Sequence, residues 1–508
     1  MRGTLVILLA CATGCTSLHD YVRHGFKVGP NFSSPKAVVA DAWIDAGNPN
    51  VSSEPTDAAA WWRTFGDPTL DSLICDAYRQ NLTLRAAGLR ILEARAQRAI
   101  VVGELFPQSQ QLDGSYSRNN ASANAANPIP NRFYNDWTAG AGFAWELDFW
   151  GQFRRAIESA DAQLNATMYN YDDVLVLLLS DVANNYVTLR TAEQRIRYAR
   201  KNVEIQQGSL HLTELKFSNG ATTRLDVTQA QSNLSQTQAT IPPLVALRRQ
   251  AANQLCILLA KPPHDLEQVL GERDIPAASP MVAIGVPADL LRRRPDIRRA
   301  ECEVAAQSAQ IGVATAALYP HFSIAGSIYY DAANFKDLFT GSSAGGTVGP
   351  TFRWDVLNYG RLLNGVRLQD ARFQELVIQY QNTVLRANAE AENALVGFLQ
   401  AQQQVKFLAT SVQAAEQSLG LVEQQYNEGR ADFNRVFNVQ QTLTQQEDQL
   451  AVARGSVSQN LVQLYKALGG GWQIRLDGAA ATPLDAGDVT QPAQEPAEPT
   501  TPTPDATL

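Results

Sequence analysis

The sequence predicts an α+β membrane protein in which each chain supplies four transmembrane strands and two long helical hairpins. Three observations predict this fold class: a duplicated seven-residue pattern in two long helical stretches, an alternating aromatic pattern before each stretch, and an export signal at the N-terminus. Four strands are too few to close a barrel, and an open sheet edge in hydrocarbon leaves backbone groups without hydrogen bonds. We therefore expect several chains to share one barrel, and the pattern alone leaves two, three or four chains open.

The N-terminus has the features of a signal peptide. Arg2 precedes an apolar run that is too short to span a bilayer, and small residues lead into Cys15. This segment resembles a bacterial lipoprotein signal, which implies that Cys15 becomes the acylated N-terminus after cleavage; Cys11 is a competing match. Thr16, rather than Asp, follows Cys15, and the same resemblance then favours the outer membrane. The alternative is an ordinary secretory peptide with an incidental Cys.

Two segments with strand periodicity precede the long helices. Residues 137–147 and 348–356 alternate apolar with small or polar residues, and each has an upstream partner of similar pattern. Alternation over about ten residues, rich in aromatics, is the weak signature of a membrane-spanning strand. The sequence therefore predicts β-hairpins at about 108–148 and 320–357, the alternative being a soluble antiparallel sheet with one wet face.

The two long helical stretches are copies of one another, offset by 209 positions. Val384 falls on Leu175, and Phe398 on Leu189, in unbroken seven-residue runs. An apolar period of seven predicts a coiled-coil seam with left-handed supercoiling. The helices are expected at 151–218 and 360–427, and at 1.5 Å per residue each is roughly 100 Å long.

Each long helix is followed by a turn and a returning helix. Gly220 and Gly429 sit just past the last seam residue, where a glycine in left-handed geometry is expected to end the helix. The apolar period resumes at once, so each copy is a helical hairpin with its tip at the glycine. The return helices are predicted at 222–260 and 432–468.

The remaining segments are expected outside the coiled coil. Residues 242–285 contain two Pro-Pro pairs and short apolar runs, which suggests that the connection between repeats lies outside the coiled coil. With residues 60–75 and 465–475 this connection is expected to form a collar around the helices. The predicted order of segments is a signal peptide at 1–14, a lipid-anchored segment at 15–68, a first repeat at 69–285, a second repeat at 286–472, and a disordered Pro/Thr-rich tail at 473–508.

Composition excludes several function classes. The net charge is −8 and no basic block is present, so nucleic acid is not an expected partner. Cys75, Cys256 and Cys302 are odd in number and far apart, so they are expected as thiols rather than disulfides. The five histidines are scattered without metal-ligand spacing, and no catalytic pattern occurs. We expect no enzyme and no cofactor apart from the covalent lipid on Cys15.

Several short motifs resemble one known family, the TolC-like outer-membrane efflux proteins (outer membrane factor family), especially its lipoprotein branch typified by OprM and NodT. The motifs are Val28-Gly29-Pro30-Asn31-Phe32, Trp61-Trp62, Phe65-Gly66-Asp67-Pro68, Leu225-Asp226-Val227 with Gln231, Arg293-Arg294-Pro295-Asp296-Ile297, Tyr319-Pro320 and Tyr465-Lys466-Ala467-Leu468-Gly469-Gly470-Gly471-Trp472. Their order covers the chain from Cys15 to Trp472. The resemblance implies a homotrimer with a 12-stranded barrel in the outer membrane and a 12-helix periplasmic tunnel.

The resemblance also implies a function and a set of partners. Such a tube conducts small molecules, drugs or toxic compounds, passively to the exterior from an inner-membrane pump of the resistance-nodulation-division type, through a periplasmic membrane-fusion adaptor. In the family the pore is narrowest near the hairpin tips. The matching tip residues here are Gly220, Arg224, Asp226, Gly429, Asp432, Asn434, Arg435 and Asn438. The family often has Asp at the position of Asn438 and a leucine-like residue at that of Asn434, so a purely acidic gate is not expected. By analogy with the family, Arg224 or Arg435 paired with Asp226 or Asp432 would hold the tip shut; the alternative is that these charges cap helix ends in water.

Three alternatives share parts of this pattern. An exit duct for type I protein secretion uses the same tube. A periplasmic coiled-coil adaptor shares the signal and one helical hairpin, but lacks the paired aromatic segments before each long helix. A structural envelope lipoprotein shares everything except a hollow interior.

Overall fold

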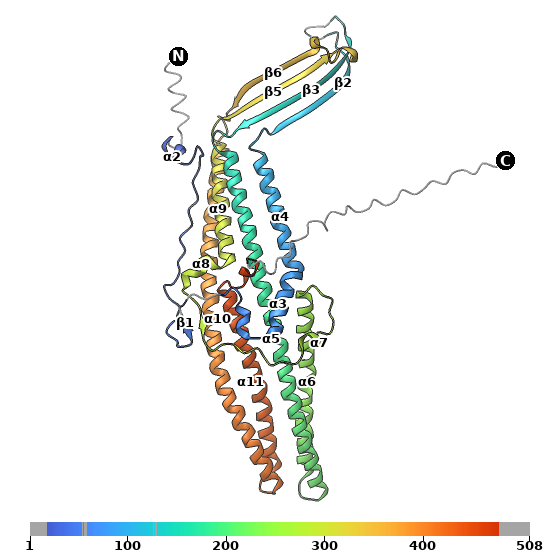
Figure 1. Cartoon of the computed structure of the whole chain (residues 1–508), viewed down its shortest axis with the longest axis vertical. Coiled ribbons are helices and arrows are strands. Elements are labelled where there is room, and N and C mark those ends of the chain that lie inside the picture. The colour runs from blue at the N-terminus through green and yellow to red at the C-terminus, as the bar shows by residue number, and fades with distance from the viewer. Residues whose placement is uncertain (1–17, 53, 55–57, 125, 127–129, 477–508) are drawn as a thin grey trace, which may run out of the picture.

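The structure, a computed structural model, describes residues 18–476 except 53, 55–57, 125 and 127–129. It is a long rod of helices with a β-sheet at one end, and the sheet leans away from the rod (Figure 1). The predicted lipid site Cys15 and its competitor Cys11 lie outside the described residues. Within the described part of the chain, no helix combines the length and apolar character needed to cross a membrane. The elements in chain order are α2 (Leu18–Arg23), β1 (Val51–Ser52), η1 (Trp61–Phe65), α3 (Pro68–Gln80), α4 (Leu82–Gly103), β2 (Ser109–Asn120), β3 (Phe133–Leu147), α5 (Gln152–Ser218), α6 (Arg224–Leu258), α7 (Glu267–Leu270), β4 (Val282–Ala283), η2 (Pro287–Asp289), α8 (Leu290–Arg293), α9 (Pro295–Ala316), β5 (His321–Ala332), η3 (Phe335–Asp337), η4 (Gly341–Ser343), β6 (Ala344–Arg353), α10 (Arg361–Asn427), α11 (Phe433–Ala467) and η5 (Trp472–Arg475).

The internal repeat governs the helices. α5 and α10 both have 67 residues, and their first and last residues differ by 209 positions (361 − 152 and 427 − 218). The same offset relates α6 to α11, each of 35 residues. Gly151 and Gly360 cap the long helices with φ of 81° and 80°, a left-handed conformation that glycine adopts without steric cost.

The four strands form one antiparallel sheet in the order β2-β3-β5-β6. Alternation puts the large apolar residues on one face, where Leu112, Ala141 and Ile328 lie in one cross-strand row. The opposite face is polar or small; there Ser115 and Thr138 are joined by a hydrogen bond of 2.8 Å. Among the described residues of one chain, the outer strands β2 and β6 each have one unpaired edge.

The main hydrophobic core lies midway along the rod. It joins η1, α3, the connection between repeats and parts of the long helices. Trp61 is buried and stacks on Tyr465 at 5.7 Å between ring centroids, and β1 pairs with β4 in parallel. Segments near both ends of the chain therefore pack around the helices at the level predicted for the collar.

The first return helix ends close to the predicted boundary. It was expected at 222–260, and α6 runs from Arg224 to Leu258 through Pro242 and Pro243. A proline removes one backbone donor and usually breaks a helix. Here the prolines are exposed, so water can bind the freed carbonyls, and α6 packs on α5 along its length. Tertiary packing overrides the local preference, and the connection begins after Leu258.

The predicted disordered tail begins too early. Residues 473–476 are ordered, because η5 is fixed to the helices by Trp472, whose indole donates to the carbonyl of Arg293 at 3.1 Å, and by Arg475. The Arg475 guanidinium binds the buried Asp172 carboxylate in a two-bond arrangement of 2.5 and 2.9 Å. The rest of the predicted tail, residues 477–508, lies outside the described residues.

Candidate functional site

The two hairpin tips lie together at the end of the rod opposite the sheet (Figure 1). Gly220 and Gly429 have φ of 71° and 74°, the left-handed geometry expected from their place after the long helices. In both turns the glycine N–H and the next N–H return to the last helical turn, as in Ala221 N to Lys216 O at 2.8 Å and Arg430 N to Gln425 O at 2.8 Å. These bonds satisfy carbonyls that a helix end leaves free.

The acidic tip residues start the return helices. Thr223 and Asp226 form a capping box at the start of α6, and the side chain of Asp432 accepts from Arg435 N at 3.1 Å at the start of α11. Partial burial of Asp226 opposes its ionisation, but hydrogen bonds from Thr222 and Thr223 outweigh burial and hold its pKa below the ordinary value. Asp226 is therefore ionised at neutral pH.

The other predicted tip residues are exposed to solvent. Arg224 is the first residue of α6, and Asn434, Arg435 and Asn438 lie in the first two turns of α11. Among the ion pairs of the described residues, neither Arg224 nor Arg435 takes part, and the two acids act as helix caps. The structure thus brings all eight predicted residues to one end of the molecule, with both arginines unpaired within the described part of the chain.

A contact between the two hairpins was missed from the sequence. The Lys216 ammonium lies 3.9 Å from the centroid of the Tyr426 ring and donates to the Tyr426 carbonyl. Gln440, which is 2% exposed, donates to Ser209 at 2.6 Å and accepts from Asn233 at 3.3 Å. A buried amide at a seam position could have signalled this link, since it needs partners.

Charged pairs continue the contact between hairpins away from the tip. Arg195 holds Asp448 with two bonds of 2.7 and 3.0 Å. Lys201 contacts Glu416 at 3.0 Å and Glu447 at 3.3 Å, and these contacts, the one to Glu416 foremost, raise the pKa of Lys201 above its ordinary value. The two hairpins of one chain are therefore joined over several turns.

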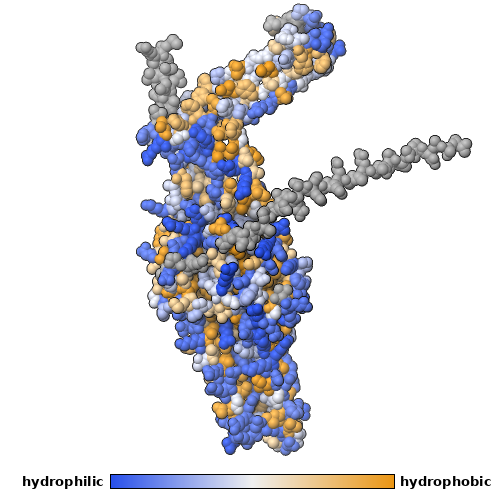
Figure 2. Space-filling view, viewed as in Figure 1, coloured by the Kyte–Doolittle hydropathy of each residue, from blue (hydrophilic) through white to orange (hydrophobic). Residues whose placement is uncertain are grey.

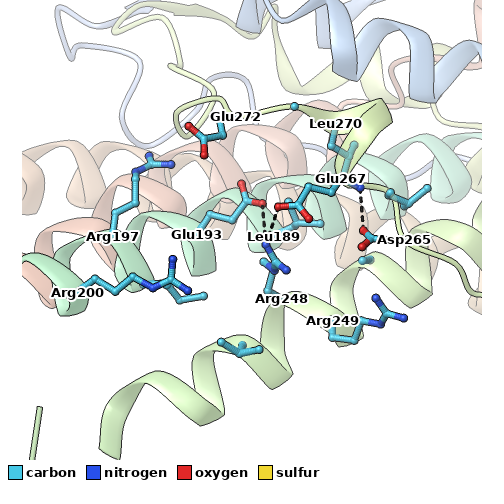
Figure 3. Close-up of a pocket in the computed structure, with 15 residues that line it drawn as sticks. Leu189, Glu193, Arg197, Arg200, Arg248, Arg249, Asp265, Glu267, Leu270 and Glu272 are labelled. Carbon is cyan, nitrogen blue, oxygen red and sulfur yellow. Dashed lines mark hydrogen bonds and ion pairs between the residues drawn. The ribbon is translucent and has the colours of Figure 1, made fainter. Parts of the chain in front are cut away.

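A charged groove lies farther up the rod, between α5, α6 and α7. Its volume is about 440 Å³, and arginines and carboxylates face one another across it (Figure 3). Arg248 lies 4.0 Å from Glu193 and 3.9 Å from Glu267, at the limit of ion pairing. Because both signs of charge line the groove, it has no marked preference for anions or cations.

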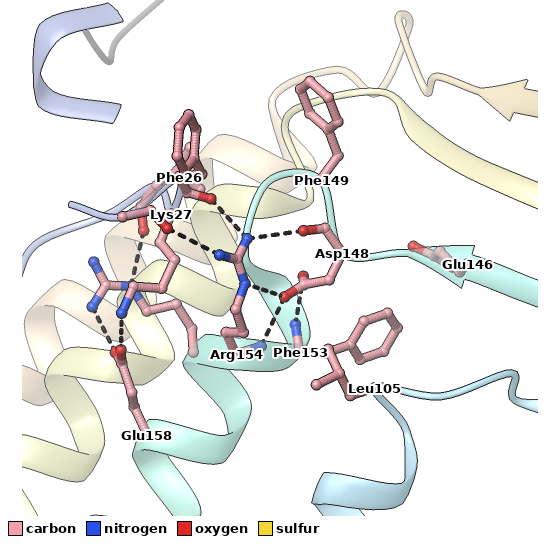
Figure 4. Close-up of polar contacts among 12 residues, drawn as sticks. Phe26, Lys27, Leu105, Glu146, Asp148, Phe149, Phe153, Arg154 and Glu158 are labelled. Atoms are coloured by element: carbon pink, nitrogen blue, oxygen red, sulfur yellow. Dashed lines mark hydrogen bonds and ion pairs between the residues drawn. The ribbon is translucent and has the colours of Figure 1, made fainter. Parts of the chain in front are cut away.

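The N-terminal segment is fixed beside the base of the sheet. The Arg154 guanidinium lies between Asp148, at 2.8 Å, and the carbonyls of Gly25 and Phe26, at 2.9 and 2.8 Å (Figure 4). The neighbouring Arg155, which is buried, donates to the carbonyls of Val28 and Gly29 at 3.1 Å each. Lys27 pairs with Glu158 in the same cluster. The segment that follows the predicted lipid site is thus held at a defined position along the rod, beside the base of the sheet.

The sheet carries a large apolar surface in the isolated chain. Leu112, Ile328, Val348 and Phe352 are each about two-thirds exposed or more, at 88%, 67%, 74% and 72%. Figure 2 shows hydrophobic residues along the sheet, whereas the helical tips are mostly hydrophilic. A surface of this size marks contact with lipid or protein.

Comparison with known proteins identifies relatives over most of the chain. The family model described as "Outer membrane efflux protein" matches residues 73–261 and 286–470, which correspond to the two repeats. The chain is 30% identical over 458 residues to Nodulation protein T of Rhizobium leguminosarum bv. trifolii, covering 90% of this chain and 97% of that protein. It is 31% identical over 439 residues to the pyoverdine export outer membrane protein OpmQ of Pseudomonas aeruginosa, covering 84% of this chain and 90% of that protein.

Solved structures of similar fold include two channels. The outer-membrane channel OprN superposes with a TM-score of 0.82 at 31% identity, covering 88% of this chain and 99% of that chain. A structure of CusC, reported for its folding and transmembrane channel formation, superposes with a TM-score of 0.76 at 25% identity, covering 87% of this chain and 100% of that chain.

Proposed function

Because the chain belongs to the outer membrane efflux protein family, we propose that three copies of it form one channel through the outer membrane. The protein is the outer-membrane component of a tripartite efflux system. It conducts small molecules from an inner-membrane pump and a periplasmic adaptor to the exterior, and the pump supplies the energy.

The sheet is the observation that carries this proposal. Its apolar face suits lipid and its polar face suits a water-filled lumen. Both of its edges are open, and unpaired edges inside a bilayer are costly at several kcal/mol for each unsatisfied group. Pairing β2 of one subunit with β6 of the next satisfies every edge, and three chains with four strands each give a 12-stranded barrel.

The helices supply the periplasmic part of the same tube. At 1.5 Å per residue, a 67-residue helix is about 100 Å long. The tips at Gly220 and Gly429 then lie deep in the periplasm, where they meet the adaptor and its pump. In the tip half of the rod, two long helices and two return helices from each of three chains, α5, α6, α10 and α11, make a 12-helix wall.

The substrate class is small molecules. Names of relatives include pyoverdine export, toluene efflux and cation efflux proteins. These cargoes differ chemically although the channel proteins are similar in sequence. The pump and adaptor, rather than the channel, therefore select most of the substrate. A type I protein-secretion duct would use the same tube, but the relatives named for small cargoes favour efflux. The presence of two hairpins and a sheet in one chain disfavours a periplasmic adaptor.

The N-terminus is anchored by lipid on Cys15. The fixed position of residues 25–29 beside the base of the sheet supports this proposal, since that base is the periplasmic edge of the barrel and lies next to the inner leaflet. Mass spectrometry of the N-terminal peptide from outer membranes tests it. A diacylated or triacylated Cys15 is expected, whereas an unmodified peptide would reject the anchor.

The tip is the gate of the channel. Each acidic cap uses one carboxylate oxygen in the bonds described, Oδ2 of Asp226 and Oδ1 of Asp432, which leaves the other oxygen for an arginine. Arg224 and Arg435 are exposed beside these caps, and in the trimer they close the tip by pairing across hairpins.

Single-channel conductance in a planar bilayer tests both channel and gate. The purified protein should give discrete channels of low conductance, and Arg224→Ala with Arg435→Ala should raise that conductance by removing the closing pairs. Arg249→Ala, an exposed arginine away from the tip, is the matched control and should leave conductance unchanged. Absence of channels would reject the function, while unchanged conductance of the double variant would reject only the gate.

A further inference from the structure

The apolar face of the sheet has a defined height. Its lowest cross-strand row contains Phe322 and Phe352, and its highest apolar row contains Tyr116, Trp137 and Ala332. Along β5 these rows are 10 residues apart (332 − 322). At about 3.4 Å per residue and a strand tilt of about 40°, that length spans about 26 Å of membrane. An apolar band of this height matches the hydrocarbon layer, so the row with Trp137 lies at its outer boundary.

The connection between β5 and β6 folds over this boundary, at the end of the sheet farthest from the rod (Figure 1). Phe335 in η3 lies against Trp137, with 5.0 Å between ring centroids, and Phe339 lies against Tyr330 at 5.6 Å. Both phenylalanines are largely exposed, at 60% and 67%. Trp137 and Tyr330 belong to the apolar face, so the connection adds aromatic surface to that face. Aromatic rings of this kind are typical of a bilayer interface.

Basic side chains follow directly beyond the aromatic row. Arg118 is the next residue of β2 on the apolar face, and its cross-strand neighbour is Asn135. Arg132 precedes β3, where its guanidinium carbon lies 5.9 Å from the ring centroid of Phe133 and its Nε donates to the carbonyl of Ala121 at 3.0 Å. Both arginines are therefore placed just outside the apolar band.

Lys336 of η3 is the third basic residue at this level. Arg118, Arg132 and Lys336, the basic cluster, are all exposed, and none of them takes part in an ion pair among the described residues. Figure 2 shows hydrophilic surface gathered at this far end of the sheet, beyond the hydrophobic residues along it. The cluster thus combines open cations with an aromatic surface directly below them.

The acids at this end of the sheet are placed elsewhere. Register puts Asp136 and Asp331 on the polar face, opposite the basic cluster. Asp337 in η3 is half-buried and accepts from Asn334 at 3.3 Å. The apolar side of the sheet is therefore electropositive at its far end.

We propose that this end of the sheet binds lipid A, the phosphorylated glycolipid of the outer leaflet, with its phosphates at Arg118, Arg132 and Lys336 and its acyl chains against the aromatic rows below. The inference rests on the proposed function, in which the apolar face lies in the outer membrane and the helices lie in the periplasm. Lipid A presents phosphates directly above hydrocarbon chains. Guanidinium and ammonium groups donate charge-assisted hydrogen bonds to such phosphates.

Charge favours this lipid over the phospholipid of the inner leaflet. Near the base of the sheet, Arg154 is bound by Asp148, and Lys27 pairs with Glu158. At the far end, the basic cluster has no acidic partner within the described part of the chain. The cations left open on the apolar side thus lie at the leaflet that contains phosphorylated glycolipid.

Lipid titration of the purified trimer tests the proposal. The protein is extracted from outer membranes in a mild detergent, stripped of lipid and heated with increasing amounts of lipid A that keeps both phosphates. The unfolding midpoint should rise with lipid A. In the combined variant Arg118→Gln, Arg132→Gln, Lys336→Gln, the apparent affinity should fall about tenfold or more, because several charge-assisted hydrogen bonds are lost.

A matched control removes the same charge at other places. Arg353 lies in the row of His321 on the polar face, while Arg361 and Arg430 are 71% and 76% exposed at the start of α10 and at the tip. The combined variant Arg353→Gln, Arg361→Gln, Arg430→Gln should keep the affinity of the unaltered protein. An equal loss of affinity in this control would overturn the proposal, because charge alone would then explain the binding.

Two further probes distinguish the lipid class. Lipid A with a single phosphate should bind more weakly than lipid A with both, and phosphatidylglycerol should bind more weakly still. Equal affinity for phosphatidylglycerol and lipid A would overturn the proposal in favour of general anionic-lipid binding. Unchanged lipid A affinity in the variant of the basic cluster would also overturn it.

Lipid that co-purifies with the protein gives an independent measurement. Mass spectrometry should find lipid A with the unaltered trimer and with the control, and much less with the variant of the basic cluster. Equal lipid A content in all three would overturn the inference and leave the channel intact. A monomer, or a chain absent from the outer membrane, would instead reject the proposed function.

Discussion

Single residues in the N-terminal segment fix its path along the rod. Gly29 has φ of 81°, and a Cβ at this residue would lie 2.5 Å from the Cα of Gly312 in α9. The segment therefore touches the helix backbone directly. The sequence motif around Gly29 was recognised only by resemblance, because neither the left-handed φ nor the distant contact with α9 is encoded locally.

Gly29→Ala should release this segment from the helices. The clash adds to the backbone strain of a left-handed alanine, which is of order 1–3 kcal/mol, and trypsin should cleave faster after Arg23 and Lys27. Gly25→Ala is the matched control, since its φ is also positive at 70° but a Cβ there meets only Lys27 Cε, at 4.0 Å. Equal cleavage of the two variants would contradict the role of the close contact.

At the scale of elements, periodicity was a reliable guide. The seven-residue pattern and the end glycines located both long helices, because apolar positions at that spacing require a partner helix. α6 passes through the Pro242-Pro243 pair, as the predicted return helix at 222–260 required, because packing on α5 supports the helix there. The order of η5 after Trp472 was also missed, because it depends on Arg475 reaching Asp172, 303 positions away.

The tip glycines provide a test of hairpin geometry. Gly429→Ala should destabilise the tip by about 1 kcal/mol, because its φ is 74° and no atom within 4 Å would compensate. Gly420→Ala, inside α10 with equally open surroundings, should instead stabilise the helix by about 0.5–1 kcal/mol. Hydrogen exchange of tip amides should be faster in Gly429→Ala and slower in Gly420→Ala. A change of the exchange rate in the same direction in both variants would contradict the assigned geometry.

At the scale of the whole molecule, a single chain is an open structure. In the part of the chain that the structure describes, the sheet has two free edges, α10 has an uncovered apolar face, and α6 has an exposed polar face. The sequence indicated that several chains share a barrel, but the number came from family resemblance, because strand count alone allows more than one closed ring. The amide of Gln440 at a seam position signals a need for partners, but which residues supply them was not predictable, since the contacts between hairpins join residues more than 200 positions apart.

The most direct test of the shared channel is the native mass of the protein extracted from outer membranes in detergent. We expect a particle with three chains, each of 55.4 kDa before the signal is removed. A water-soluble monomer or dimer would contradict it, because the free edges of the sheet and the open face of α10 would then have no partner in the membrane.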